Sequence, residues 1–137
     1  MISFNYQTFY GFRNKKKIKL WLLECIMHLQ RTEGNLNYVF CNNKYILEMN
    51  KKYLNHDYTT DIITFDYSVE NHLHAEFYVS LEQIKENAKQ YKTKFDNELH
   101  RVLVHGILHL AGYNDKTNKE QMEMRAKEDY YLSLRTF

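Results

Sequence analysis

Apolar residues recur along the chain with two different spacings, which predicts a mixture of strands and helices. Apolar and polar residues alternate over 2–6, as in a half-buried strand. Over 15–30, apolar residues instead recur every three or four positions, as in a helix with one buried face. The same two patterns predict strands at 36–41, 61–67 and 73–79, and helices at 44–54, 81–94, 97–111 and 118–134.

Polar residues and glycines mark the expected ends of these elements. An Asn, Asp, Ser or Thr side chain at a helix start accepts a hydrogen bond from a backbone N–H that has no partner within the helix. Gly34 should break the chain after the first helix, and Gly112 should end the helix at 97–111 in a left-handed conformation. The expected N-caps are Asn14, Asn42 or Asn43, Ser80, Asp96, and Thr117 or Asn118.

The order of the elements predicts an α+β fold. Helices connect the first three strands, which favours parallel pairing. The short turn at 68–72 predicts an antiparallel hairpin between 61–67 and 73–79. We therefore expect a small mixed sheet of four strands covered by about five helices.

Length and composition favour a single domain over 1–137, which can bury a core of its own. The formal net charge is only +2, so a case for nucleic-acid binding depends on local patches. Cys25 and Cys41 form neither a disulfide framework nor a metal-binding pair, which favours a reducing compartment, the cytoplasm. No apolar stretch is long enough to span a bilayer, and the first residues lack the pattern of a signal peptide.

The segment from His105 to Asp115 is the main candidate for chemistry. His105 and His109 are four residues apart on a predicted helix, so both imidazoles lie on one face. Gly112 lets the chain turn, which can bring Asp115 to the same point. The flanking residues are apolar, and burying two histidines there is costly unless a metal ion satisfies their nitrogen atoms. Three ligands that leave one position open are typical of a catalytic site for a divalent metal such as zinc.

Position 106 holds Gly, so the H-E-x-x-H signature of metalloproteases, in which the Glu is the general base, is absent. Peptide hydrolysis by that route is therefore disfavoured. The nucleophile that the sequence favours is a water molecule bound to the metal, activated for hydrolysis.

The same segment resembles the signature of the YbeY proteins, bacterial metal-dependent endoribonucleases linked to ribosomal RNA maturation and ribosome quality control. The family pattern is H-G-x-L-H-L-x-G-Y-D-H, and its three histidines are zinc ligands. This chain reads His105-Gly-Ile-Leu-His109-Leu-Ala-Gly112-Tyr113-Asn114-Asp115. Asp115 stands where the family has its third histidine, and a carboxylate ligand there favours harder metal ions.

A second segment resembles the family pattern N-x-x-Y-R-x-x-D-x-P-T-D-V-L-S-F. Its Asn, Tyr, Asp, Thr-Asp and Phe positions fall on Asn50, Tyr53, Asp57, Thr60, Asp61 and Phe65. Leu54 replaces the Arg that is implicated in catalysis in the family, and Thr59 replaces the Pro. Charge that develops on a phosphate would then have to be met by the metal and by another cation.

The resemblance implies a sheet of three parallel strands and one antiparallel strand, flanked by helices. It also implies a zinc-dependent, single-strand-specific endoribonuclease that acts in 3′-end maturation of 16S ribosomal RNA and has the ribosomal subunit as a partner, without a nucleotide cofactor or a membrane. Two alternatives stay open, a metallohydrolase for another class of substrate and a ribosome assembly factor whose metal is mainly structural.

Basic residues outside the metal segment are candidates for binding phosphate. Arg101 lies one turn before His105 and is a candidate catalytic residue, although an ordinary helix ion pair explains it as well. Glu98 and Asp61 have structural explanations, as a first-turn acid and a turn residue. A basic cluster surrounds the start of the first helix, where positive charge opposes the helix dipole, and either RNA binding or a solvated surface explains it. This basic cluster contains Arg13, Lys15, Lys16 and Lys17.

Overall fold

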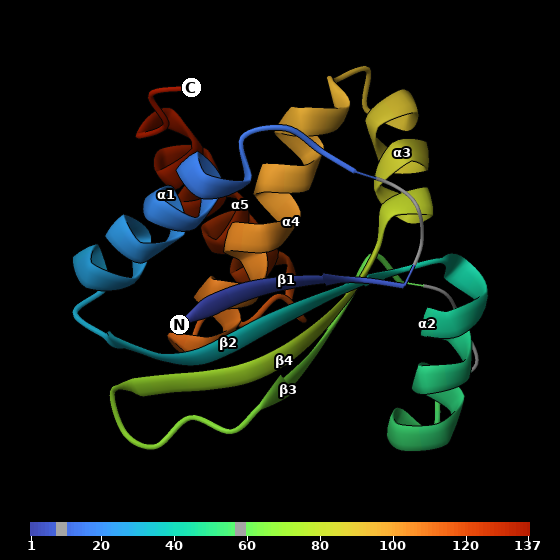
Figure 1. Cartoon of the computed structure of the whole chain (residues 1–137), viewed down its shortest axis with the longest axis horizontal. Coiled ribbons are helices and arrows are strands. Elements are labelled where there is room, and N and C mark those ends of the chain that lie inside the picture. The colour runs from blue at the N-terminus through green and yellow to red at the C-terminus, as the bar shows by residue number, and fades with distance from the viewer. Residues whose placement is uncertain (8–10, 57–59) are drawn as a thin grey trace.

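A mixed β-sheet forms the centre of the fold (Figure 1). The structure, a computed structural model, describes residues 1–7, 11–56 and 60–137. β1 pairs with β2 and β2 with β4 in parallel, whereas β3 pairs with β4 antiparallel, in the order β1-β2-β4-β3. The strands are β1 (Ile2–Tyr6), β2 (Thr32–Cys41), β3 (Ile62–Asp66) and β4 (His72–Ser80).

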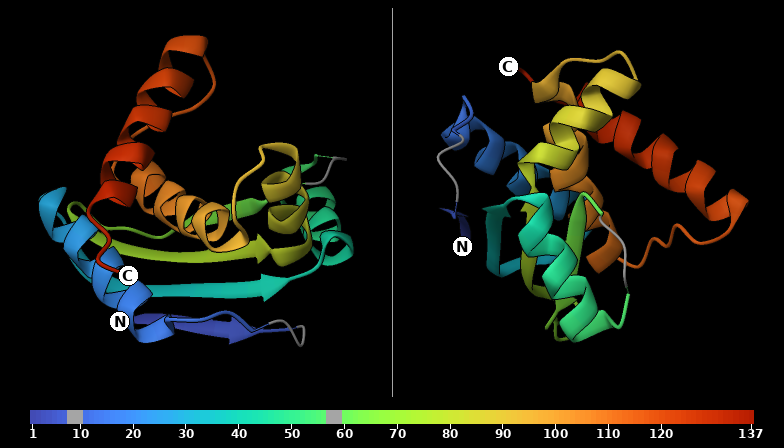
Figure 2. Two further views of the ribbon diagram at one scale, coloured as in Figure 1. Left: turned by 90° about the horizontal axis from the view of Figure 1, so that it is seen from above. Right: turned by 90° about the vertical axis from the view of Figure 1, so that its right-hand side faces the viewer.

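Five α-helices accompany the sheet within the described residues. They are α1 (Lys15–His28), α2 (Asn43–Met49), α3 (Leu81–Gln90), α4 (Phe95–Leu110) and α5 (Asn118–Ser133), and α2 continues into a π-helical turn, η1 (Asn50–Leu54). In Figure 1, α1, α4 and α5 gather above the sheet. The right-hand view of Figure 2 shows α2 near the bottom, apart from α1, α3 and α5 at the top. The predicted α+β fold, with three parallel strands and one antiparallel strand, is confirmed. The expectation that the first three strands are the parallel ones is wrong, because β4 pairs with β2 and leaves β3 as the antiparallel edge strand.

The packing of α4 against the sheet explains why the candidate ligands lie beside β3 and β4. Its residues Val102, Leu103 and Ile107 are at most 4% exposed. Gly106, which faces β4, allows this close approach, because a Cβ atom there would lie 2.7 Å from Cε1 of Phe77. A side chain at this position would push the helix away from the sheet, so the glycine fixes where its two neighbouring histidines lie.

Three of the predicted N-caps are confirmed and two are wrong. The side chains of Asn42, Ser80 and Thr117 accept hydrogen bonds from backbone N–H groups in the first turns of α2, α3 and α5. Asn14 instead adopts a left-handed conformation, with φ of 65°, and makes no capping hydrogen bond. Asp96 lies inside the first turn of α4 rather than before it.

The prediction that Gly34 breaks the chain is also wrong. β2 runs through this residue from Thr32 to Cys41. The pairing of β2 with β4 shifts in register between Glu33 and Leu36. The irregularity at Gly34 is therefore absorbed within the strand, as a bulge-like shift, and the strand begins earlier than the apolar pattern indicates.

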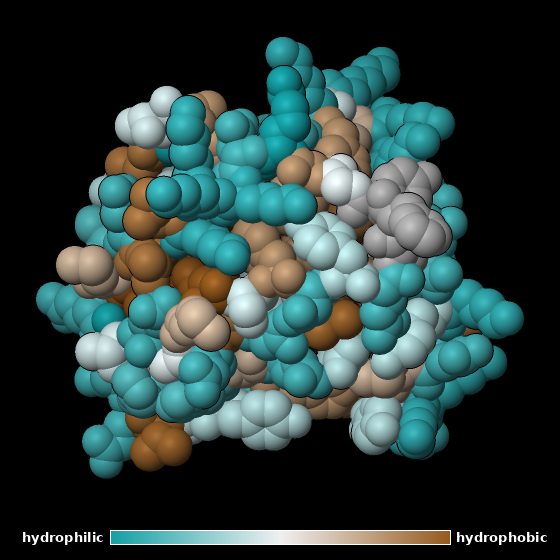
Figure 3. All heavy atoms as spheres, viewed as in Figure 1, coloured by the Kyte–Doolittle hydropathy of each residue, from teal (hydrophilic) through white to brown (hydrophobic). Residues whose placement is uncertain are grey.

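The apolar side chains are concentrated in the interior. The largest fully buried side chains include Tyr38, Tyr131, Phe40 and Phe77. The face shown in Figure 3 is largely hydrophilic, with smaller hydrophobic areas between polar side chains. In the part of the chain that is described, no helix combines the length and the apolar character needed to cross a membrane.

Candidate metal centre

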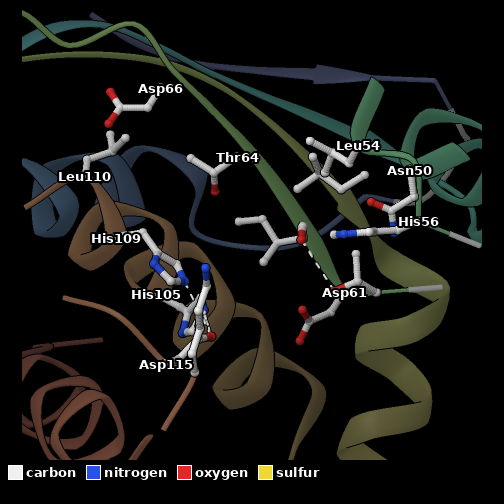
Figure 4. A pocket seen from close by; sticks show the side chains of 14 residues that line it. Asn50, Leu54, His56, Asp61, Thr64, Asp66, His105, His109, Leu110 and Asp115 are labelled. Atoms are coloured by element: carbon white, nitrogen blue, oxygen red, sulfur yellow. Dashed lines mark hydrogen bonds and ion pairs between the residues drawn. The ribbon is translucent and has the colours of Figure 1, made fainter. Parts of the chain in front are cut away.

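Two histidines of α4 and one aspartate of the following loop meet at one point (Figure 4). The ring centroids of His105 and His109 are 4.5 Å apart. The Nε2 atom of each ring lies 3.4 Å from Oδ2 of Asp115. The structure thus brings together the three side chains that the sequence predicts as metal ligands, with one potential ligand atom of each within 4.8 Å of the others.

The turn that ends α4 explains how Asp115 reaches the histidines. Gly112 has a φ of 102°, in the left-handed region. Its N–H donates to the His109 carbonyl oxygen at 3.1 Å, and the Tyr113 N–H donates to the Leu108 carbonyl oxygen at 3.0 Å. These two bonds are those of a Schellman motif, which closes a helix and redirects the chain. The glycine therefore has the role that the sequence predicts for it.

The spacing and the chemistry of these donors fit a tetrahedral divalent metal ion. Two ligand atoms at about 2.0–2.1 Å from a zinc ion are about 3.4 Å apart at the tetrahedral angle. That separation is found between Oδ2 of Asp115 and each of the two Nε2 atoms. Two imidazoles and a carboxylate suit zinc and other divalent transition-metal ions.

Glu128 of α5 orients the first histidine. Nδ1 of His105 donates a hydrogen bond to Oε2 of Glu128 at 2.6 Å, which leaves Nε2 as the nitrogen with a free lone pair. Glu128 is not among the site residues predicted from the sequence. A signal was present, because Glu128 lies in the same helical stripe as the buried residues Met124, Tyr131 and Leu132, where an acid needs a partner.

The electrostatic environment shifts the pKa values of the two histidines in opposite directions. Burial disfavours a charged His105, but the hydrogen bond to Glu128 and the charges of Glu128, Asp61 and Asp115 outweigh it and raise the pKa of His105. Burial and the neighbouring His105 lower the pKa of His109. Burial also raises the pKa of Asp61. Carboxylates thus surround the candidate centre, as expected of a site for a cation.

Hydrogen bonds link Arg101 to His105 through Glu128. Its Nη1 donates to Oε1 of Glu128 at 2.9 Å, and its Nη2 donates to Oδ1 of Asp129 at 2.6 Å. The side chain is 11% exposed. This geometry is that of a buried ion pair that holds the glutamate in place. The predicted contact between Arg101 and a phosphate stays a prediction.

An open cleft of about 600 Å³ extends from the histidines and Asp115 to η1 and β3. Figure 4 shows Asp61 and Thr64 across from the histidines, with Leu54 farther along the same side. Lys116 brings a positive charge to the lining, whereas Leu54 brings none. The cleft therefore offers a phosphate one cation beside the ligands and an uncharged side chain at the position of the family's arginine.

The second family-like segment forms the opposite wall of this cleft. Asn50, Thr60 and Asp61 line it, and Tyr53 packs edge-on against Phe65 with ring centroids 5.9 Å apart. Asp57 and Thr59 of the family pattern lie outside the described residues.

The basic cluster at the start of α1 is separate from the candidate centre. Arg13 pairs with Asp96 at 2.8 Å, and Nζ of Lys15 lies 4.7 Å from the ring centroid of Tyr6. Arg13 lines a different hollow, beside the start of α4, and among the described residues none of the basic cluster lines the cleft. The predicted RNA-binding role of Arg13, Lys15, Lys16 and Lys17 stays a prediction.

The fold and the site define a class: small α+β proteins in which two histidines and a carboxylate form a candidate catalytic metal centre in an open cleft. The family described as Endoribonuclease YbeY matches residues 4–135 of the chain. The chain therefore belongs to the YbeY family, and the resemblance seen in the sequence is confirmed.

Relatives in this family are similar over nearly the whole chain. Endoribonuclease YbeY of Flavobacterium psychrophilum is 44% identical over 134 residues, which cover 98% of this chain and 96% of the relative. The protein of the same name from Cytophaga hutchinsonii is 46% identical over 135 residues, covering 98% and 94%. The solution structure of TM1509 from Thermotoga maritima is similar with a TM-score of 0.67 and 29% identity, covering 97% of this chain and 87% of that one.

Proposed function

We propose that this protein is a metal-dependent endoribonuclease that cleaves single-stranded RNA, within a single domain over 1–137. His105, His109 and Asp115 would hold one divalent metal ion per chain, for which zinc is our candidate. The observation that carries the proposal is the meeting of these three side chains in an open cleft, in a chain that belongs to the YbeY family.

A metal ion bound there would polarise a phosphoryl oxygen and lower the pKa of a water molecule from about 15.7 towards about 7. The chain's own residues prepare the site for such an ion. Glu128 holds the Nδ1 proton of His105, so that Nε2 is available as a ligand. Lys116 lines the cleft beside Asp115, where its ammonium group can contact the substrate phosphate.

The exposure of the ligands favours a catalytic metal over a structural one. The side chains of His105, His109 and Asp115 are 20%, 29% and 41% exposed. Structural zinc sites are closed by four protein ligands, whereas catalytic sites keep a position open to water or substrate. An assembly factor with a mainly structural metal is therefore the less well supported alternative.

We further propose that the substrate is ribosomal RNA, that cleavage contributes to 3′-end maturation of 16S RNA, and that the protein acts on the ribosomal subunit in the cytoplasm. The name Endoribonuclease YbeY of the relatives supports RNA as the substrate. The ribosomal role follows from the family resemblance alone.

Metal analysis combined with a cleavage assay tests the proposal. Protein purified without chelators is assayed for divalent metals, stripped, and reloaded separately with zinc, manganese and magnesium. Each form is incubated with a labelled single-stranded RNA and with the same RNA in a duplex. We expect about one metal ion per chain and metal-restored cleavage of the single strand only.

Two outcomes would contradict different parts of this proposal. A protein that holds no divalent metal, and takes none up, has no metal centre at these residues. A protein that binds one metal ion per chain but cleaves neither the single strand nor the duplex lacks the proposed nuclease activity, which would favour one of the two alternatives, another hydrolase or a structural metal.

A further inference from the structure

A second cavity adjoins the candidate metal centre, and the proposed mechanism gives it no role. Its volume is about 240 Å³, and it shares Asp61, His105 and Asp115 with the cleft. Its remaining lining includes an aromatic ring, an amide, a carboxylate and two guanidinium groups. These belong to Tyr91, Asn87, Glu98, Arg101 and Arg125.

Glu98 is the unusual residue of this cavity. It is 5% exposed, yet no side chain or backbone group of the described residues donates a hydrogen bond to its carboxylate. Burial raises the pKa of Glu98, whereas the charges of Arg101 and Arg125, which make no hydrogen bond to its carboxylate, act to lower it. Among the described residues, the one fully buried side-chain polar atom without a partner is Oη of Tyr6, so the Glu98 oxygen atoms reach solvent in the cavity. A ligand that brings donors can therefore replace water at this carboxylate.

The other side chains of the cavity can bind the base and the phosphate of a nucleotide. Tyr91, directly after α3, is 57% exposed and lines the cavity, so its ring has a face free for stacking. Arg125 of α5 is exposed and makes no hydrogen bond or ion pair with the described residues, so its guanidinium is free for a phosphate. Proteins recognise single-stranded RNA by this combination of aromatic stacking and hydrogen bonds to base edges.

We propose that this cavity is a subsite for the base of a nucleotide next to the scissile phosphate, and that the base is guanine. This inference rests on the proposed function, because the cavity adjoins the candidate metal centre. The N1–H and N2–H groups of guanine are adjacent donors that match the two oxygens of the Glu98 carboxylate. Uracil, cytosine and adenine do not present two adjacent donors on that edge.

The size of the cavity agrees with a single base. Sites for drug-sized ligands measure about 300–1,000 Å³, and the volume of about 240 Å³ lies below that range. In this arrangement Tyr91 stacks on the base, Glu98 accepts its hydrogen bonds and Arg125 contacts the adjoining phosphate. Glu98 is thus a specificity-determining residue and not only a first-turn acid of α4.

Binding of defined oligonucleotides tests this proposal. The probes are fluorescent uridine dodecamers that carry one central guanosine, inosine, adenosine or uridine, and affinity is measured by anisotropy on the full-length protein. Inosine is guanosine without the 2-amino group. A hydrogen bond to a charged acceptor is worth about tenfold or more in affinity, so wild type should bind the guanosine probe at least about tenfold more tightly than the inosine probe.

Two variants, each with a matched control, test which side chains recognise the base. Glu98→Gln should bring the ratio of guanosine to inosine affinity close to one, whereas Glu86→Gln, at an exposed position of α3, should leave the ratio unchanged. Tyr91→Leu should weaken binding of all four probes about tenfold, the typical loss for one stacked base. Tyr67→Leu, at a 63% exposed position outside this cavity, should not.

The outcomes separate this inference from the proposed function. Equal binding of the guanosine and inosine probes by wild type overturns the guanine subsite without reference to any variant. An unchanged ratio in a folded Glu98→Gln variant overturns it as well. If wild type binds none of the four probes, the proposed function itself fails.

Discussion

α4 contains the buried His100 in its first half and the half-buried His105 in its second half, and different partners give these two residues different chemistry. Near the start of the helix, His100 is 4% exposed, and its Nδ1 accepts a hydrogen bond from Nη1 of Arg135 at 2.7 Å. Five residues later, Nδ1 of His105 donates to Glu128. Arginine can only donate and an ionised carboxylate can only accept, so the neutral imidazoles carry their protons on opposite nitrogen atoms.

This difference decides which histidine is suited to bind a metal. Burial and the charge of Arg135 lower the pKa of His100 to about 4, so the ring stays neutral within the packed start of the helix. His105 has its proton held by Glu128, and its Nε2 faces Asp115 in the cleft. A histidine on an apolar helix is therefore not by itself a sign of a metal ligand, and the partner of its other nitrogen atom must be known.

Removing each histidine in turn is the test with the largest expected effect. We predict that His105→Ala and His109→Ala lose the bound metal, because each removes one of the three proposed ligands. Asp115→Ala should weaken metal affinity while the fold is kept. His100→Ala should retain about one metal ion per chain. Metal content is measured after gel filtration, and the fold is checked by circular dichroism. A His105→Ala variant that keeps its full metal content would contradict the prediction that His105, unlike His100, is needed to bind the metal.

The Arg101 ion pair is expected to stabilise the fold around His105. Arg101→Ala leaves the carboxylate of Glu128, which is 7% exposed, without its cation. Breaking a buried pair on one side costs about 3 kcal/mol or more, so we predict a loss of about 3 kcal/mol in the free energy of unfolding, measured in urea. Arg125→Ala, at an exposed position, is the control and should change it by less than about 0.5 kcal/mol. A loss below about 1 kcal/mol for Arg101→Ala would show that the ion pair contributes little to stability.

His100 should make the stability of the protein depend on pH. Its pKa in the folded protein is about 4, below the usual 6.5. Between pH 6.5 and pH 4 the unfolded chain therefore binds a proton at this residue that the folded protein does not bind. Stability is therefore unaffected by His100 above pH 6.5 and falls as the pH drops to 4, by up to about 3 kcal/mol.

A non-titrating variant isolates this contribution. His100→Asn keeps an acceptor for Arg135 and should flatten the fall in stability between pH 6.5 and 4 relative to wild type. His72→Asn, at an exposed position of β4, should not. The same slope in wild type and His100→Asn would show that the arginine does not hold the ring neutral.

Glu128 should tune the candidate metal centre without being a ligand. Loss of a carboxylate that orients a ligand histidine typically weakens metal affinity about 10–100-fold. We predict a change of that size in Glu128→Ala, measured by competition with a chelator. Asp129→Ala removes the other partner of Arg101 but leaves His105 untouched, so its metal affinity should stay within about twofold of wild type. Equal weakening in both variants would mean that the arginine, and not the glutamate, controls the site.

The sequence predicts the three candidate ligands but not their hydrogen-bond partners, for a physical reason. His105, His109 and Asp115 lie within one helix end and one turn, where helical spacing and a left-handed glycine determine the geometry locally. Glu128 and Arg135 reach α4 from α5 and the segment after it, and only tertiary packing brings them there. The same limit applies to the wrong N-cap at Asp96, which forms an ion pair with the distant Arg13 instead of capping α4.

The smallest expected effect concerns the basic cluster, which lies towards the start of α4 and not towards its ligand end. Arg13 already pairs with Asp96, and Lys15 lies over the Tyr6 ring, so part of this charge is engaged within the protein. We predict that changing Lys15, Lys16 and Lys17 to Ala weakens binding of single-stranded RNA modestly. Each lost phosphate contact should reduce the slope of log affinity against log salt by about 0.7. Lys116→Ala in the cleft is the matched comparison. If only Lys116→Ala changes the slope, the basic cluster is a solvated surface, and RNA binding is confined to the end of α4 that carries the ligands.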